Sequence, residues 1–159
     1  MQARAWLNAL RDAPRKKPLP VLSFPCVSLL NITVKDLIAD SVLQAEGMRR
    51  VAERADAAAA VSFMDLSVEA EAFGCPIRIS DDEVPTVTGA VITSEEEARA
   101  LPVPEVGAGR TGRCIEAIKK AAALITDRPV FAGVIGPFSL AGRLMDVTEA
   151  LVNCYTEPD

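Results

Sequence analysis

A run of seven apolar or small residues, Ala57 to Phe63, ends in an acidic stretch and constrains the fold more than any other feature of the chain. It has the length of a buried strand and follows a segment, residues 41–55, whose apolar positions recur at helical spacing. A buried strand directly after a helix is typical of a βαβ unit with parallel strands. The sequence therefore predicts an α/β fold around this run.

The same alternation of strands and helices extends over most of the chain. Leu19 to Phe24 predicts a first buried strand, and Val130 to Ile135 predicts a third. Further helices are predicted over Ala3–Asp12, from Thr33 through a cap at Asp40 or Ser41, over Cys114–Ile125 and over Ser139–Val152. This order fits either a doubly wound sheet or part of a (β/α) barrel, and three strands complete neither.

Residues 75–92 interrupt this alternation and predict a β-hairpin, because isoleucines and valines alternate there around a turn at Asp81 and Asp82. Ser94 and Glu97 predict a capping box for a short helix that ends at Leu101. The following PVPEVGAGRTG is a predicted loop whose glycines would permit movement.

Composition excludes several classes of function for these 159 residues. The net charge of −5 would repel nucleic acid and anionic membranes, so we expect neither as a partner. There is no histidine, and the four cysteines lie far apart, so no zinc-binding spacing is present. The N-terminus lacks the apolar stretch of a secretory signal, and no run is long enough to span a bilayer, so we expect a cytoplasmic protein.

Ligands of α/β proteins bind at the carboxyl ends of the strands, and three such ends are predicted: Pro25 to Thr33, Asp65 to Glu71, and Gly136 to Ser139. We expect substrate-binding residues at or beside these ends, namely Cys26, Asn31, Met64, Gly136, Phe138 and Ser139.

Asp65 and Glu69 are the predicted catalytic residues. Asp65 follows a desolvated strand, which suits an acid, a base or a cation anchor, but it could equally cap the next turn through the amides of Ser67 or Val68. Glu69 lies four residues after Asp65 and can face the same pocket if the segment is helical. Glu71 would then face the surface.

Three stretches, PLPVLSFP from Pro18, FMDLSVEAEAFGCPI from Phe63 and VIGPFSLAGRL from Val134, resemble the uroporphyrinogen decarboxylase superfamily in its methylcobamide:coenzyme M methyltransferase-like branch. The resemblance implies a (β/α)8 TIM barrel, of which this chain would be the N-terminal half. The half would form a single domain, 1–159, with an N-terminal helix and linker at 1–17 and a hairpin insertion at 75–92.

The resemblance also implies a reaction, in which a thiol such as coenzyme M takes a methyl group from a corrinoid protein. Zinc converts the thiol to a thiolate in this branch. Its ligands, one histidine and two cysteines, lie in the second half of the family's chain, so we expect this half alone to bind no cofactor and to be inactive.

Two alternatives stay open at this point. The first is uroporphyrinogen decarboxylase itself, a lyase of porphyrin biosynthesis, in which Asp65 would bind the pyrrole nitrogens. CVSLLNIT, beginning at Cys26, replaces the arginine-rich loop of those enzymes, which weakens this reading. The second is a non-catalytic scaffold. In every case an uncovered strand edge would favour a complementary half-barrel or a homo-oligomer.

Overall fold

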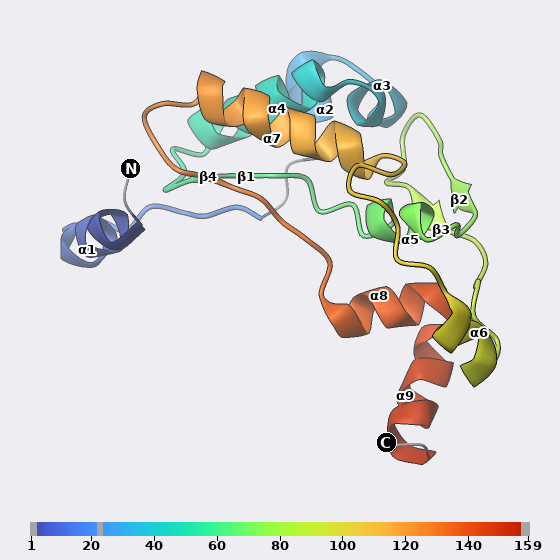
Figure 1. Cartoon of the computed structure of the whole chain (residues 1–159). Helices are drawn as coiled ribbons and strands as arrows, with labels where there is room; N and C mark the ends of the chain where they lie inside the picture. Colours follow the sequence, from blue (N-terminus) through green and yellow to red (C-terminus); the bar gives the residue numbers. More distant parts are fainter. Residues whose placement is uncertain (1–2, 22–23, 157–159) are drawn as a thin grey trace. The chain divides into compact units, whose positions relative to one another are not determined.

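The computed structural model describes residues 3–21 and 24–156, which form two compact units (Figure 1). The first unit comprises the described residues up to 64 together with 114–133, and the second comprises 65–113 and 134–156. The single domain expected over 1–159 stays a prediction.

The first unit contains the parallel strand pair. Its helices are α1 (Ala3–Asp12), α2 (Cys26–Leu30), α3 (Val34–Ala39), α4 (Ser41–Arg54) and most of α7 (Thr111–Leu124). Strands β1 (Ala60–Val61) and β4 (Val130–Phe131) pair in parallel, with Ala60 opposite Val130. The predicted parallel arrangement is confirmed, although both strands are shorter than the apolar runs that predicted them.

The strand predicted over Leu19 to Phe24 is not formed by those of its residues that the structure describes. Leu22 and Ser23 lie outside the described residues, Leu19 to Val21 form no strand, and Phe24 begins the turn that leads into α2. The amide of Ala58 nevertheless donates to the Pro18 carbonyl at 2.8 Å. The residues before this segment therefore lie beside the approach to β1.

Two side-chain caps fix where α3 and α4 begin. Thr33 and Asp36 form a capping box, in which each side chain accepts a hydrogen bond from the other residue's amide at 3.0 Å. Asp40 caps α4 by accepting from the amides of Val42 at 2.6 Å and Leu43 at 3.2 Å. Both caps agree with the helix starts predicted from the sequence.

Small side chains let the elements of the first unit approach one another closely. The core is built mostly from alanine and contains Ala45, Met48, Ala52, Ala57, Ala60, Ala121 and Ile125. At Gly47 of α4 the approach is closest, because an added Cβ would lie 2.6 Å from the Cys26 sulfur. Gly47 is thus required by packing against Cys26 on α2.

The second unit combines an antiparallel pair with short helices. Its elements are α5 (Val68–Ala72), β2 (Ile77–Arg78), β3 (Thr86–Val87), α6 (Glu95–Ala100), α8 (Pro137–Leu144) and α9 (Val147–Thr156). Ile77 pairs with Val87 inside the segment predicted as a hairpin. That this hairpin is an insertion into a barrel stays a prediction. The core of the second unit contains Ala70, Cys75, Ile92 and Leu144.

The helix predicted over Ser139 to Val152 is wrong as a single element, because the chain divides it into α8 and α9 at Met145 and Asp146. Asp146 has a φ of 102° and accepts hydrogen bonds from the amides of Thr148 at 2.8 Å and Glu149 at 3.4 Å. An aspartate that satisfies free amides in this way starts a new helix.

The longest helices of the described ranges, α4 and α7, have 14 residues each, whereas spanning a bilayer takes about 20. No helix within residues 3–21 and 24–156 is long and apolar enough to cross a membrane.

Candidate functional site

Asp65, four residues after β1, is a buried turn residue in the structure. It is 8% exposed, and its Oδ1 accepts hydrogen bonds from the Ser67 amide at 3.0 Å and the Ser67 hydroxyl at 2.5 Å. These bonds match the alternative in which Asp65 caps the turn that follows it. Burial of its carboxylate also requires a counterion, since an unpaired buried charge is strongly unfavourable.

Arg110 supplies that counterion from the loop between α6 and α7. Its Nη1 donates to Oδ2 of Asp65, its Nε donates to Oε2 of Glu71, and its Nη2 donates to the Ser67 hydroxyl at 2.8 Å. Arg110 is 5% exposed. Burial would lower the pKa of Arg110, but the charges of Asp65 and Glu71 outweigh it and raise that pKa. The guanidinium is therefore permanently charged.

The glycines around Arg110 give its loop a defined shape. Gly107 and Gly109 have φ values of 92° and 56°, a region that favours glycine. An added Cβ at Gly112 would lie 2.8 Å from the Gly107 carbonyl oxygen. The sequence suggested that these glycines permit movement, whereas in the structure they allow a tight path that places Arg110 against Asp65.

Glu71 and Glu69 lie in different surroundings. The sequence placed Glu71 at the surface, which is wrong, because its side chain is 29% exposed and pairs with Arg110. Glu69 is half-buried, and its Oε1 accepts a hydrogen bond from the Ile135 amide at 3.1 Å. The structure thus joins Asp65, Glu71 and Arg110 in one network, and Glu69 contacts a different segment of the second unit. The catalytic roles of Asp65 and Glu69 stay predictions.

The predicted binding residues of the first unit differ in accessibility. Cys26 is fully buried, and burial raises the pKa of its thiol to about 12, so the thiol stays protonated and is not presented to solvent. Asn31 is exposed and ends α2 with a φ of 54°. Met64 is half-buried. Their part in binding substrate stays a prediction, which the burial of Cys26 does not support.

The predicted binding residues of the second unit lie at the start of α8. Gly136 is the N-terminal cap of this helix, and Phe138 and Ser139 belong to its first turn. All three are exposed, Phe138 by 48%. Their role in binding substrate likewise stays a prediction.

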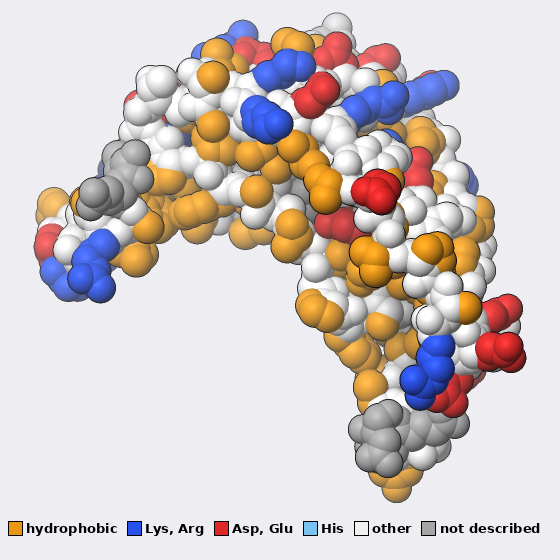
Figure 2. Space-filling model, viewed as in Figure 1, with side chains coloured by type: hydrophobic (Ala, Val, Ile, Leu, Met, Phe, Trp, Pro, Cys, Tyr) orange, Lys and Arg blue, Asp and Glu red, His pale blue; other side chains and the backbone are white. Residues whose placement is uncertain are grey.

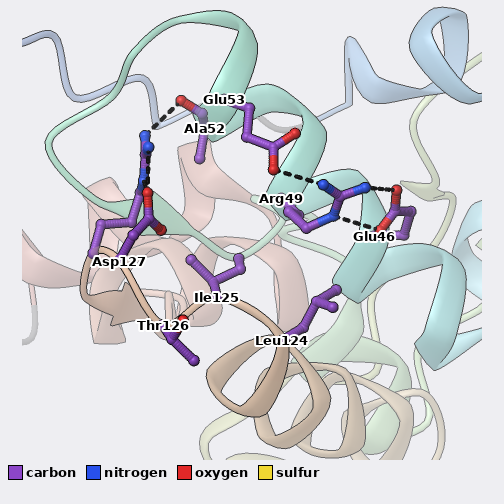
Figure 3. Close-up of a pocket in the computed structure, with 9 residues that line it drawn as sticks. Glu46, Arg49, Ala52, Glu53, Leu124, Ile125, Thr126 and Asp127 are labelled. Atoms are coloured by element: carbon purple, nitrogen blue, oxygen red, sulfur yellow. Dashed lines mark hydrogen bonds and ion pairs between the residues drawn. The ribbon is translucent and has the colours of Figure 1, made fainter.

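A charged pocket that the sequence did not indicate lies in the first unit (Figure 3). Its volume is about 420 Å³, and α4 and the segment before β4 form its walls. Arg49 pairs with Glu46 and Glu53, and its guanidinium lowers the pKa of Glu46 to about 2. Arg128 donates to the carbonyls of Ala52 and Ala57. These charges are satisfied by one another, which is typical of a structural cluster.

The described residues do not fit a zinc ion. The chain has no histidine, two of its cysteines, Cys26 and Cys75, are buried, and Cys154 is exposed. Within the ranges that the structure describes, no three histidine, cysteine, aspartate or glutamate side chains lie close enough together to hold a metal. Any zinc of a complete enzyme would need ligands from outside these residues.

Comparisons with known proteins identify relatives for most of the chain. The family model described as uroporphyrinogen decarboxylase (URO-D) matches residues 26–159. The methylcobamide:CoM methyltransferase MtbA of Methanosarcina acetivorans is 34% identical over 86 residues, which are 50% of this chain and 24% of MtbA. A solved methyltransferase from Methanosarcina mazei superposes with a TM-score of 0.75 and 23% identity.

The superposition covers 95% of this chain and 47% of the Methanosarcina mazei chain. It supports an α/β fold of the TIM-barrel-like type seen in that methyltransferase. The chain therefore spans about half the length of the solved protein that it matches, and its match to MtbA covers a smaller part still.

Proposed function

Because the chain belongs to the uroporphyrinogen decarboxylase family, we propose that it supplies the N-terminal half of a corrinoid-dependent methyltransferase of that family. In the proposed reaction a methyl group passes from a methylcorrinoid protein to a thiol such as coenzyme M. The observation that carries this proposal is the 34% identity to a methylcobamide:CoM methyltransferase. We also propose that the protein is located in the cytoplasm.

Within this proposal the acidic segment after β1 divides into two roles. Both oxygens of Asp65 are occupied, one by Ser67 and one by Arg110, so Asp65 orders the turn that carries α5. Glu69 sits on α5 outside that network. We assign it the role of the general base that accepts the proton of the thiol. Zinc, which in the complete enzyme would favour the thiolate, would be held by residues outside the ranges that the structure describes.

The decarboxylase alternative has no supporting observation among the described residues. It requires Asp65 to accept hydrogen bonds from pyrrole nitrogens, whereas its carboxylate already accepts from Ser67 and from Arg110. Displacing Arg110 would leave a buried guanidinium without its main counterion, which is costly. A lyase of porphyrin biosynthesis is therefore not our proposal.

An assay of methyl transfer tests the proposal. The chain is combined with a polypeptide covering the part of the Methanosarcina mazei methyltransferase that it does not match, together with zinc, methylcobalamin and coenzyme M. We expect consumption of methylcobalamin and of free thiol only when both polypeptides are present. The chain active alone, or a mixture without methyl transfer, would refute the proposal.

A variant separates Glu69 from the general integrity of the site. We expect Glu69→Gln to lower the rate by about 100-fold, the usual contribution of a general base. The exposed Glu83→Gln is the matched control and should leave the rate unchanged, since Glu83 forms an exposed ion pair with Arg78.

A further inference from the structure

A pocket in the first unit lies between α1 and the residues that precede β1 and β4. Its volume is about 260 Å³, slightly below the range of about 300–1,000 Å³ that is usual for small-molecule sites, so an occupant must be small. Ala57, Ala58, Arg128 and Pro129 line it, and each of them comes shortly before its strand begins. The pocket is therefore at the amino ends of the parallel strands, whereas the binding residues predicted from the sequence belong to carboxyl ends.

Apolar side chains form most of the wall of this pocket. Helix α1 contributes Trp6, Ala9 and Leu10, and Pro129 adds apolar surface from the strand side. Figure 2 shows hydrophobic side chains and the side chains of Lys and Arg next to one another over α1. A ligand that fills the pocket must therefore carry an apolar body as well as a group that suits basic side chains.

Trp6 holds α1 in place as one wall of the pocket. Its indole Nε1 donates to the Ala58 carbonyl at 3.1 Å, and its ring meets the ring of Phe131 edge-to-face with centroids 5.2 Å apart. This wall is therefore preformed, which lowers the entropic cost of binding.

The segment after α1 is fixed at both of its ends. Lys16 donates through Nζ to the carbonyls of Leu10 and Arg11, each at 2.8 Å, and so satisfies the end of the helix. Two residues later the Pro18 carbonyl accepts the hydrogen bond from the Ala58 amide at 2.8 Å. The basic residues of the pocket lie on the short stretch between these anchors.

Three cations border the pocket, and two carboxylates compensate two of them. Lys17 pairs with Asp56 at 2.8 Å, and Arg128 pairs with Asp127 at 2.7 Å. Arg15, which lines the pocket and is exposed, forms no ion pair or hydrogen bond with any residue in the ranges 3–21 and 24–156. Three positive and two negative charges thus leave one positive charge uncompensated.

One uncompensated charge favours a monoanion. A carboxylate carries a single negative charge at pH 7, whereas a phosphate monoester carries about two. The guanidinium of Arg15 can bind a carboxylate through two parallel hydrogen bonds, and Lys17 has further donors besides the one given to Asp56. Because the chain as a whole carries a charge of −5, attraction of an anion must come from these local side chains.

We propose that this pocket binds a small organic carboxylate, with its charged head at Arg15 and Lys17 and its apolar body against Trp6. The site goes beyond the proposed methyl transfer and does not rest on it, because its residues precede the strands whose far ends carry the predicted catalytic segment.

The fluorescence of Trp6 tests this proposal directly, since Trp6 is the single tryptophan of the chain. The full chain is titrated with hexanoate at low ionic strength. We expect a saturable change in tryptophan emission with a Kd on the order of 1 mM. Acetate, which has the head without the body, and 1-hexanol, which has the body without the head, should each bind about tenfold more weakly or worse.

A matched pair of variants separates the pocket from the general charge of the chain. Arg15→Gln removes the uncompensated charge and should weaken hexanoate about tenfold. Arg4→Gln makes the same change in net charge on α1, but Arg4 does not line the pocket, so the affinity should change by less than about twofold. Both arginines are exposed, and circular dichroism should show the same fold for both variants.

Four results would overturn the proposal. Absence of a saturable change with hexanoate would exclude the ligand class. Hexanoate binding that Arg15→Gln leaves unchanged would place the ligand elsewhere around Trp6. Equal weakening by Arg15→Gln and Arg4→Gln would reduce the effect to overall charge, and 1-hexanol bound as tightly as hexanoate would mean that the pocket does not recognise an anion.

Discussion

Arg110 donates through Nη1 to Oδ2 of Asp65, a residue 45 positions earlier, and the two side chains are only 6% and 5% exposed. The same guanidinium also binds Glu71 and Ser67. One arginine therefore holds the glycine-containing loop before α7 against the turn before α5, and it pairs with the charge of the buried Asp65. This makes Arg110 the residue on which the local structure of the acidic segment depends.

Replacing Arg110 by methionine should strongly destabilise the chain. The variant keeps an apolar side chain of similar length but leaves Asp65 buried without its counterion, a loss of about 3–5 kcal/mol. Urea unfolding followed by circular dichroism measures the change. Arg99→Met is the control, because Arg99 forms an exposed ion pair with Glu95 and should cost less than about 1 kcal/mol. Equal effects of the two substitutions would contradict the role assigned to Arg110.

Gly112→Ala should disturb the network of Arg110, Asp65 and Glu71 indirectly, through the backbone of the loop. The new Cβ would lie 2.8 Å from the Gly107 carbonyl oxygen, so the backbone that carries Arg110 must shift. We expect a loss of about 1–3 kcal/mol in the free energy of unfolding, as is usual for overpacking. Val106→Ala is the matched control in this loop, since Val106 is 93% exposed. A Gly112 variant as stable as the control would show that the loop has room to adapt.

Local signals in the sequence were sufficient for much of the fold. The caps at Thr33, Asp40 and Ser94 could be predicted because each satisfies amides within three residues of itself. The parallel strands could be predicted because apolar runs of strand length alternate with helical periodicity. The residues at which the strands end could not be predicted, because they depend on where the neighbouring strand pairs and not on the apolar run alone.

Contacts between distant residues were beyond these signals. Nothing local to Gly109–Arg110–Thr111 indicates a partner 45 residues away, although a carboxylate expected in a desolvated position, Asp65, needed a cation somewhere in the chain. That requirement was the signal that could have led to Arg110. The division between α8 and α9 also had a signal, because Asp146 followed three residues later by Glu149 resembles a helix start.

Gly47→Ala tests the close packing of α4 on α2. Alanine at an unobstructed helix position stabilises by about 0.5–1 kcal/mol relative to glycine. Here the Cβ would approach the Cys26 sulfur to 2.6 Å, so we expect destabilisation by about 1–3 kcal/mol in urea unfolding. Removing that sulfur in the double variant Gly47→Ala, Cys26→Ala should recover part of the loss. Strictly additive effects of the two substitutions would contradict the contact.

Alkaline pH should destabilise the folded chain through Cys26. Burial raises the pKa of its thiol from 9.0 to about 12, so the folded state keeps the proton while the unfolded state loses it above pH 9. The stabilising contribution is therefore complete below pH 9 and is lost as the pH rises toward 12. The linkage relation gives a loss of about 1 kcal/mol between pH 8 and pH 10.

The Cys26→Ala variant isolates this effect from the other groups that titrate in the same range. We expect its free energy of unfolding to fall by about 1 kcal/mol less than that of the unmodified chain between pH 8 and pH 10. A thiol reagent gives a second readout at pH 8: the exposed Cys154 should react in the folded chain, and Cys26 only after unfolding. Identical pH dependence of the two proteins, with rapid labelling of Cys26, would mean that the thiol is accessible and that the tight contact with Gly47 does not persist in solution.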